Sequence, residues 1–193
     1  MIYLFILIFS WWFSITKAVL IVDMINDFVY GKFGNKEAEK IVNNITNFLK
    51  IAEKNNIPIF FAQDNHEEDD IELDIWGDHA MKDEEGSETI PELKQFDSII
   101  IEKHYYDSFF DTELEEILID KGIDKIYLGG VTTDICVQHT AAGAFFRGYD
   151  VMVLSDCCVA MSKEKHKNAL DYMKTVYGAK IENTKKVIEN WKK

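Results

Sequence analysis

The chain has 193 residues, of which 47% are hydrophobic, and it carries a formal net charge of −13 at neutral pH. This size and composition predict one globular domain with a substantial core. The acidic balance argues against a nucleic-acid partner, because binding to a phosphate backbone needs a basic face. Arg147 is the one arginine, so a bidentate guanidinium clamp on a phosphate or carboxylate substrate is nearly excluded as well.

The N-terminal segment 1–15 is almost wholly apolar, and the first charged side chain is Lys17. This run is shorter than the ~20 apolar residues that a membrane helix needs, and a strand begins almost directly after it. It also shows neither the basic start nor a clear cleavage site of a secretory signal. Three interpretations stay open: a wrongly assigned start codon, an apolar appendage that packs on the domain or on a partner, and a weak anchor. We expect residues 1–16 to be an extension, 17–193 to form the domain, and no membrane association.

Apolar runs of strand length alternate along the chain with helical patterns. The predicted strands cover 18–24, 58–63, 98–103, 125–130, 150–155 and 179–184. The predicted helices cover 36–55, 113–122, 134–147, 163–176 and 184–191. Each strand is a continuous apolar run, which is typical of a sheet covered on both faces. The alternation predicts an α/β fold: a doubly wound, three-layer α/β/α architecture around a mostly parallel six-stranded sheet.

Residues 64–97 interrupt this alternation with a long acidic segment of little periodicity. A loop of this length inside a compact domain is usually functional or disordered. Its content, described below, favours a functional loop.

The three cysteines are too few and too unevenly spaced for a disulfide framework, and no CxxC motif is present. This usage predicts a reducing compartment, the cytoplasm. We interpret the neighbours Cys157 and Cys158 as packing residues in the core.

The ends of the predicted strands carry chemically active side chains. Asp23, Asp64 and Lys103 end the first three strands, and the fourth strand leads through a short turn to Cys136. Each has an ordinary structural explanation by itself, such as a turn cap, a solvated strand end or a small core residue. In open α/β sheets, however, ligands bind outside the carboxyl ends of the strands. The coincidence of four such residues at one edge favours an active site.

Three segments around these residues form recognisable motifs. The turn 130-GVTTDICV-137 resembles the pattern G-V-x-T-x-x-C-V, and 23-DMINDF-28 is similar to D-x-Q-x-D-F, with Ile25 where glutamine is usual. The segment 103-KHYYDSFFDTEL-114 is similar to K-x-x-Y-S-x-F-x-x-T-x-L, with Asp107 at the serine position. Together they resemble the nicotinamidase/isochorismatase-like cysteine hydrolases over residues 18–182 or so.

The resemblance implies that Asp23, Lys103 and Cys136 form a catalytic triad in which the thiolate of Cys136 attacks an amide carbonyl. It implies an oxyanion hole made by the backbone N–H groups of Thr132 and Cys136, and a cis peptide bond between 131 and 132. We expect the helix N-terminus and Lys103 to favour the thiolate, with Asp23 accepting the thiol proton. Water activated by Asp23 would then hydrolyse the thioester.

The long loop carries 64-DNH-66 and 76-WGDH-79, which look like the metal motifs D-x-H and W-P-x-H of the same family. Gly77 replaces the proline of the second motif, and Glu67 stands where a proline often follows the first. Asp64, His66 and His79 are therefore the expected ligands of a divalent metal, with zinc as the first candidate and iron or manganese as alternatives. Substrate contacts are expected from Phe28, Trp76 and Val131.

The first functional hypothesis is an amidohydrolase that releases ammonia from a small planar amide, with nicotinamide as the first candidate substrate. The second keeps the cysteine chemistry but acts on an N-carbamoyl or ureido compound such as N-carbamoylsarcosine or ureidoacrylate, because the acidic segment 67–75 differs from typical nicotinamidase loops. Isochorismatase activity and a non-catalytic interaction role are weaker alternatives. The resemblance also implies a homo-oligomer. The substrate, the metal and the number of subunits stay open.

Overall fold

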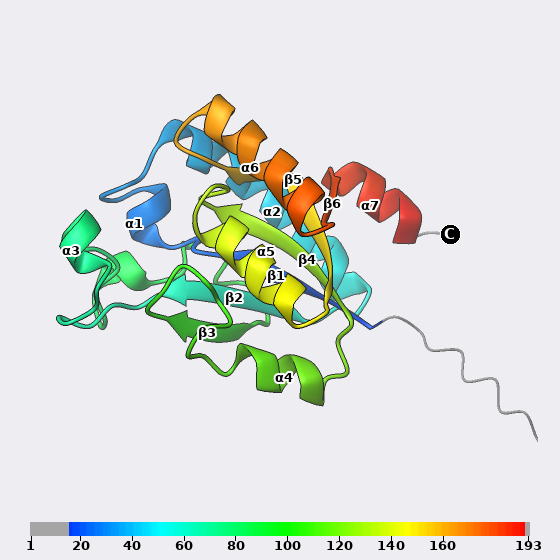
Figure 1. Cartoon of the computed structure of the whole chain (residues 1–193), viewed down its shortest axis with the longest axis horizontal. Coiled ribbons are helices and arrows are strands. Elements are labelled where there is room, and N and C mark those ends of the chain that lie inside the picture. Colours follow the sequence, from blue (N-terminus) through cyan, green and yellow to red (C-terminus); the bar gives the residue numbers. More distant parts are fainter. Residues whose placement is uncertain (1–15, 192–193) are drawn as a thin grey trace, which may run out of the picture.

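The structure, a computed structural model, describes residues 16–191; the predicted extension, apart from Thr16, lies outside the described residues. One sheet of six strands organises the molecule, in the order β3-β2-β1-β4-β5-β6 with every neighbouring pair parallel (Figure 1). The strands are β1 Lys17–Val22, β2 Ile59–Asp64, β3 Ile99–Lys103, β4 Lys125–Val131, β5 Asp150–Val159 and β6 Lys180–Glu182. The predicted α/β fold with a parallel six-stranded sheet is confirmed.

Helices cover both faces of the sheet (Figure 1). They are α1 Asn26–Val29, α2 Lys36–Lys54, α3 Leu73–Trp76, α4 Leu114–Asp120, α5 Cys136–Phe146, α6 Lys163–Val176 and α7 Thr184–Trp191, with a 3-10 turn η1 at Glu85–Ser87. Helices α2 and α7 pack on one face, and α4, α5 and α6 pack on the other. Among the described residues, no helix combines the length and the apolar character needed to cross a membrane.

The alternation of side chains along β1 explains the two cores. Val19 and Ile21 point to the α2 side, whereas Leu20 and Val22 point to the α5 side, and all four are at most 1% exposed. Because both faces of a central parallel strand are buried, the strand appears in the sequence as one unbroken apolar run.

Helix α2 illustrates how the covering helices are specified. Its N-cap, Asn35, accepts hydrogen bonds from the backbone N–H groups of Glu37 and Ala38. Apolar residues then recur at helical spacing and form one buried stripe against the sheet: Ile41, Val42, Ile45, Phe48, Leu49 and Ala52.

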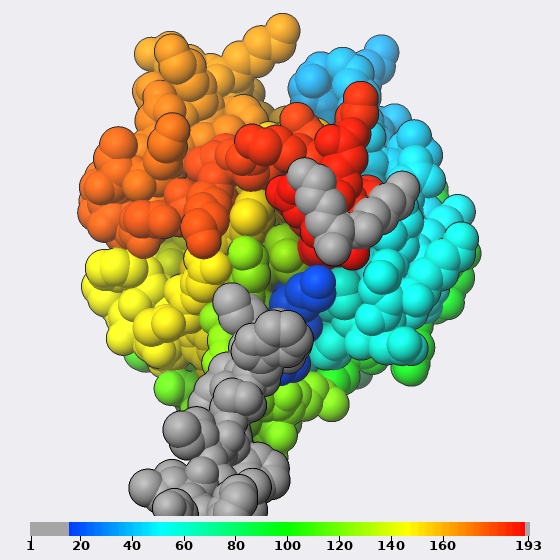
Figure 2. Space-filling model, turned by 90° about the vertical axis from the view of Figure 1, so that its right-hand side faces the viewer, coloured from blue at the N-terminus to red at the C-terminus, as the bar shows by residue number. Residues whose placement is uncertain are grey.

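The two described ends of the chain lie side by side at the edge where the strands begin, with the start of β1 between α2 and α7 (Figure 2). Lys17 Nζ lies 4.8 Å from the ring centroid of Trp191, whose indole N–H donates to the hydroxyl of Tyr127 at 2.8 Å. The strand ends that carry the candidate site are at the opposite edge of the sheet.

Most differences from the sequence prediction lie at element ends. The first strand stops at Val22, before the predicted end, because Asp23 adopts a left-handed backbone conformation with φ 53°. The strand β5 extends to Val159, beyond the predicted 155, and the helix expected from 134 begins at Cys136. The prediction of burial on both faces is wrong for β3, which is an edge strand and leaves Ile100 44% exposed.

Two neighbours on α4 provide a matched test of this packing. Leu118 is 1% exposed beneath the sheet, and Ile119 is 62% exposed on the outer face of the helix. Leu118→Ala should lower the free energy of unfolding by about 2–5 kcal/mol through the lost contacts and the cavity, whereas Ile119→Ala should change it by less than ~0.5 kcal/mol. Urea unfolding of both variants measures the difference; equal effects would contradict the assigned packing of α4.

Candidate active site

A buried ion triplet occupies the carboxyl ends of the first three strands. Lys103 ends β3, Asp64 ends β2 beside it in register, and Asp23 follows β1. The ammonium of Lys103 lies 2.9 Å from Asp23 Oδ2 and also pairs with Asp64 Oδ1. The backbone N–H of Asp64 donates to Asp23 Oδ1 at 2.9 Å. All three side chains are at most 1% exposed, so the pairing compensates charges that water does not reach.

Burial and mutual charge set the proton affinities of this triplet. Burial acts to lower the pKa of Lys103, but the charges of Asp23 and Asp64 outweigh it and raise that pKa well above its ordinary value. Burial and then the charge of Asp64 raise the pKa of Asp23 to about 6, despite the nearby ammonium. Burial also acts to raise the pKa of Asp64, yet Lys103 and His66 lower it overall. Asp23 is therefore the carboxylate better suited to accept a proton near neutral pH.

Cys136 is the first residue of α5 and is 7% exposed. Its sulfur lies within 4.8 Å of carboxylate oxygens of Asp23 and Asp64. Burial raises the pKa of the Cys136 thiol well above its ordinary value; Lys103 opposes this shift, and the two carboxylates add to it. Lys103 favours the thiolate, as expected from the sequence, whereas desolvation and the two neighbouring acids favour the protonated thiol.

The turn between β4 and α5 brings backbone donors to the same place. Gly130 has φ +123°, and a Cβ there would lie 2.0 Å from the carbonyl oxygen of Val22, so a side chain cannot be accommodated. The peptide bond between Val131 and Thr132 is cis, as expected. Within residues 16–191, the N–H groups of Thr132 and Cys136 have no backbone or side-chain acceptor. Both groups are therefore available as hydrogen-bond donors.

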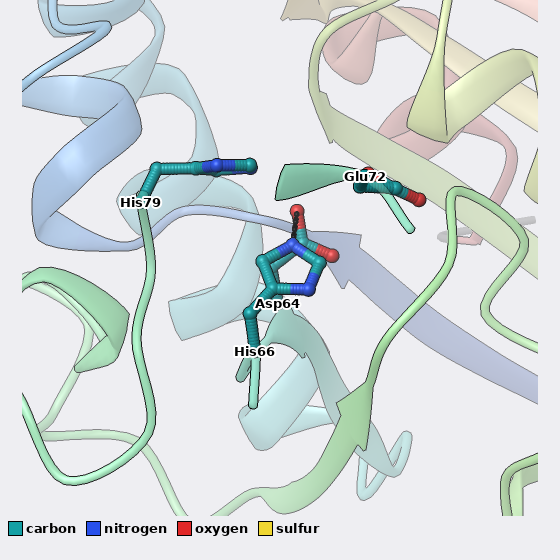
Figure 3. A group of neighbouring side chains, drawn as sticks. All are labelled: Asp64, His66, Glu72 and His79. Atoms are coloured by element: carbon teal, nitrogen blue, oxygen red, sulfur yellow. Dashed lines mark ion pairs between the residues drawn. The ribbon is translucent and has the colours of Figure 1, made fainter. Parts of the chain in front are cut away.

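Asp64 of the triplet and three further buried side chains form a donor cluster: Asp64, His66, Glu72 and His79 (Figure 3). One carboxylate oxygen or ring nitrogen from each lies within 4.8 Å of the others. His66 Nε2 is buried, has no hydrogen-bond partner and lies 3.7 Å from Asp64 Oδ2. A buried polar atom without a partner is costly unless a ligand satisfies it. The donor cluster therefore fits a divalent cation.

The proton affinities in the donor cluster reflect burial and the charges of the neighbouring groups. Burial and then the charge of Asp64 raise the pKa of Glu72 to about 8, and burial lowers the pKa of His79. Burial also acts to lower the pKa of His66, but Asp64 and Asp70 raise it overall. The raised pKa values of Glu72 and His66 favour states with less negative charge, and the lowered pKa of His79 favours the neutral imidazole that can bind a cation.

The loop that carries His79 is hydrogen-bonded to α1. His79 Nδ1 lies 2.8 Å from the carbonyl oxygen of Gly77, and the next N–H, that of Ala80, donates to Asp27 Oδ2 at 2.8 Å. Asp27 is the second acid of the 23–28 motif, so that motif supplies both Asp23 and the anchor of the His79 segment.

A pocket opens beside Cys136 and the donor cluster. Its walls are mostly aromatic and aliphatic, and the indole N–H of Trp76 donates to the hydroxyl of Tyr106 at 2.9 Å across one side. The residues around it are Phe28, Phe33, Asn35, Ala38, Asp64, Glu72, Trp76, His79, Tyr106, Val131, Thr132, Ile135, Cys136, Val159, Ala160 and Met161. None of these lining residues is a lysine or an arginine.

Comparison with known proteins places this site in a family. The family model described as the isochorismatase domain matches residues 17–186. The chain belongs to the isochorismatase family. Members of this family are amidohydrolases, and this chain is likewise a hydrolase that acts on carbon–nitrogen bonds.

Individual isochorismatase relatives differ in what they act on. N-carbamoylsarcosine amidase from Thermoplasma acidophilum is 37% identical, with a TM-score of 0.83 over 88% of this chain and 96% of that one. Nicotinamidase 3 of Arabidopsis thaliana is 30% identical over 79% of this chain and 78% of its own. The pyrazinamidase of Pyrococcus horikoshii, solved in complex with zinc, is 29% identical, with a TM-score of 0.80 over 86% and 98%.

The structure brings the expected site residues of this isochorismatase-family chain together. Asp23, Lys103 and Cys136 meet at one edge, and the three expected ligands lie in the donor cluster next to them. Three residues of the site were not predicted from the sequence: Glu72, which is a fourth donor, and Phe33 and Tyr106, which line the pocket. Tyr106 stood inside the 103–114 motif and could have been singled out there, whereas nothing in the acidic segment distinguished Glu72.

Removing the central cation of the triplet tests its structural importance. Lys103→Met should lower the free energy of unfolding by about 3–5 kcal/mol, because two buried carboxylates lose their shared partner. Lys82→Met is the control, since Lys82 pairs with Glu67 at 2.6 Å on the surface, where both side chains are about half exposed. Guanidinium unfolding should show a large shift for the first variant and almost none for the second. Similar shifts would contradict the buried pairing.

Proposed function

We propose that the chain hydrolyses a small, neutral, flat amide to its acid and ammonia, with nicotinamide as the first candidate. The observation that carries this proposal is the pocket beside Cys136, which among the described residues is lined by no lysine or arginine and includes the aromatic rings of Phe28, Phe33, Trp76 and Tyr106. Flat rings pack well between aromatic walls, and a neutral ligand needs no cationic partner.

Charge weighs against the second candidate. N-carbamoylsarcosine and ureidoacrylate each carry a carboxylate, and no lysine or arginine of the described chain lines the pocket to pair with it. Arg147, the one arginine, is committed elsewhere, because its Nε donates to Glu115 at 2.7 Å. The 37% identity to an N-carbamoylsarcosine amidase keeps the carbamoyl substrates as the alternative.

The proposed mechanism uses the three residues of the expected triad. Asp23 takes the proton of the Cys136 thiol as the sulfur attacks the amide carbonyl, so the thiolate forms only when substrate is present. The N–H groups of Thr132 and Cys136 stabilise the oxyanion. Protonated Asp23 returns the proton to the leaving ammonia, and a thioester remains on Cys136. Water deprotonated by Asp23 then releases the acid and the free thiol.

Lys103 has an electrostatic role in this scheme. Its ammonium holds Asp23 in place and remains close to the negative charge that moves from the carboxylate to the sulfur. It also fixes Asp64 at the border between the triplet and the donor cluster.

We propose a divalent metal, with zinc first and iron or manganese as alternatives, held by Asp64, His66, Glu72 and His79. The unpartnered Nε2 of His66 and the two-carboxylate, two-imidazole donor set support this assignment. When bound, the metal would supply a coordination position for a ring nitrogen of the substrate. Phe28 and Trp76 would then orient the ring so that its amide meets Cys136.

The cytoplasmic location and the homo-oligomer stay predictions. Three free, buried cysteines support a reducing compartment.

An ammonia-release screen over nicotinamide, pyrazinamide, N-carbamoylsarcosine and ureidoacrylate tests the proposed substrate class. We expect turnover of the two neutral aromatic amides, with kcat/KM at least ~100-fold above that of the two acids, because an unpaired buried charge is strongly disfavoured. Cys136→Ala should abolish release, and Cys157→Ala, which removes a buried thiol outside the pocket, should keep it. Turnover of the carbamoyl acids alone, or activity in Cys136→Ala, would refute the proposal.

Metal content tests the donor cluster separately. After purification in zinc-containing buffer and removal of loose metal, the wild-type protein should retain about one zinc per chain, as four convergent donors allow. His79→Ala should retain much less, and His139→Ala, which alters a histidine outside the cluster, should match the wild type. Elemental analysis gives the ratio. Equal metal in all three proteins would remove His79 from the ligand set.

A further inference from the structure

The imidazole of His66 contacts the carboxylate of Asp70, a residue that has no role in the proposed reaction. Its Nδ1 lies 2.8 Å from Asp70 Oδ2, on the side of the ring away from the donor cluster. The same oxygen lies 2.8 Å from His104 Nδ1 and accepts the backbone N–H of Glu67 at 3.0 Å. One oxygen of Asp70 thus connects His66 and Glu67, at the start of the long loop, to His104, which follows Lys103.

This contact determines which nitrogen of His66 carries the proton. A carboxylate oxygen can only accept, so the ring must donate from Nδ1. In a neutral imidazole, the proton on Nδ1 leaves a lone pair on Nε2. Nε2 is the atom that is buried, lacks a partner and faces Asp64. The opposite tautomer would place a lone pair against the carboxylate of Asp70 and a proton on Nε2, the atom that would have to bind the metal.

Asp70 also organises the segment that carries a second donor. Its bond to the N–H of Glu67 closes the turn over 67–70, and the N–H of Leu73 then donates to the carbonyl oxygen of Asp70 at 3.1 Å, just after Glu72. His104 connects this turn to the end of β3, because it follows Lys103 directly. The surrounding strand and turn leave the Asp70 side chain only 16% exposed.

We propose that Asp70 is a positioning residue that prepares His66 as a metal ligand by fixing its tautomer, and that His104 secures Asp70 to the sheet. This inference rests on the proposed metal site. Carboxylate–histidine–metal arrangements of this kind typically contribute about 10–100-fold in metal affinity.

The competing explanation is that Asp70 only caps the 67–70 turn. In that case its loss would loosen the loop without changing the tautomer of His66. The two explanations differ in a property of the metal-free protein, so the test does not need the enzyme reaction.

The test uses Asp70→Ala, Asp70→Asn and, as a control of equal charge change, Asp69→Ala on the exposed neighbouring acid. Nitrogen-15 NMR of the metal-free proteins at alkaline pH reports the histidine tautomers. Competition with a chelator gives the zinc affinity. Thermal unfolding confirms that each variant is folded.

We expect His66 of the wild type and of Asp69→Ala to carry its proton on Nδ1 and to bind zinc equally well. In Asp70→Ala the Nε2–H tautomer should gain population, and zinc affinity should fall about 10–100-fold. Asp70→Asn keeps an oxygen that can accept from Nδ1 and should lose less. His104→Ala should cause a smaller loss, since Asp70 retains its bonds to His66 and Glu67.

An unchanged tautomer and unchanged zinc affinity in Asp70→Ala would overturn the inference and leave Asp70 as a turn cap. Absence of zinc binding by the wild type would overturn it together with the metal site. Failure of the proposed substrate would be seen separately, as a wild type that binds zinc normally but releases no ammonia from nicotinamide.

Discussion

The ammonium of Lys103, shared by two buried carboxylates, is the interaction on which the rest of the site depends. The strand order β3-β2-β1-β4 places Lys103, Asp64, Asp23 and Cys136 in sequence along one edge. Because Asp64 and Lys103 are paired in register across β2 and β3, neither can shift along its strand without breaking backbone pairing as well. Asp64 belongs both to the triplet and to the donor cluster. A change of charge in the donor cluster therefore also acts on Lys103, Asp23 and the nucleophile.

The fold followed closely from the sequence because its main signal is simple. Central parallel strands such as β1 and β4 are buried on both faces and are therefore unbroken apolar runs, and α2 shows a clear helical stripe. The errors lie where tertiary structure overrides local pattern. The edge position of β3 exposes half of an apolar run, and the left-handed backbone of Asp23 shortens β1.

The candidate site was predictable where motifs adjoin strands and unpredictable inside the long loop. Asp64 and Lys103 could be placed because each ends a strand. Glu72 could not, because its position depends on how residues 67–76 fold back over the pocket, and that segment has no periodicity. The effect of burial on the Cys136 thiol could not be predicted from the sequence for another reason. Desolvation depends on the surrounding packing, and sequence position reports only the helix terminus and the nearby cation.

Strand β5 pairs irregularly with β4, and the residues at its end shape the pocket without taking part in the reaction. Leu128 pairs with Val153, but Gly130 pairs with Cys158, so β5 bulges between these points before it delivers Val159, Ala160 and Met161 to the pocket wall. Insertions, deletions or substitutions in the bulge can therefore reshape that wall while β1, β2 and β3 keep their register. Proteins with this fold that descend from a common ancestor could therefore change the amide substrate they accept through changes in β5, a strand that carries none of the reacting groups.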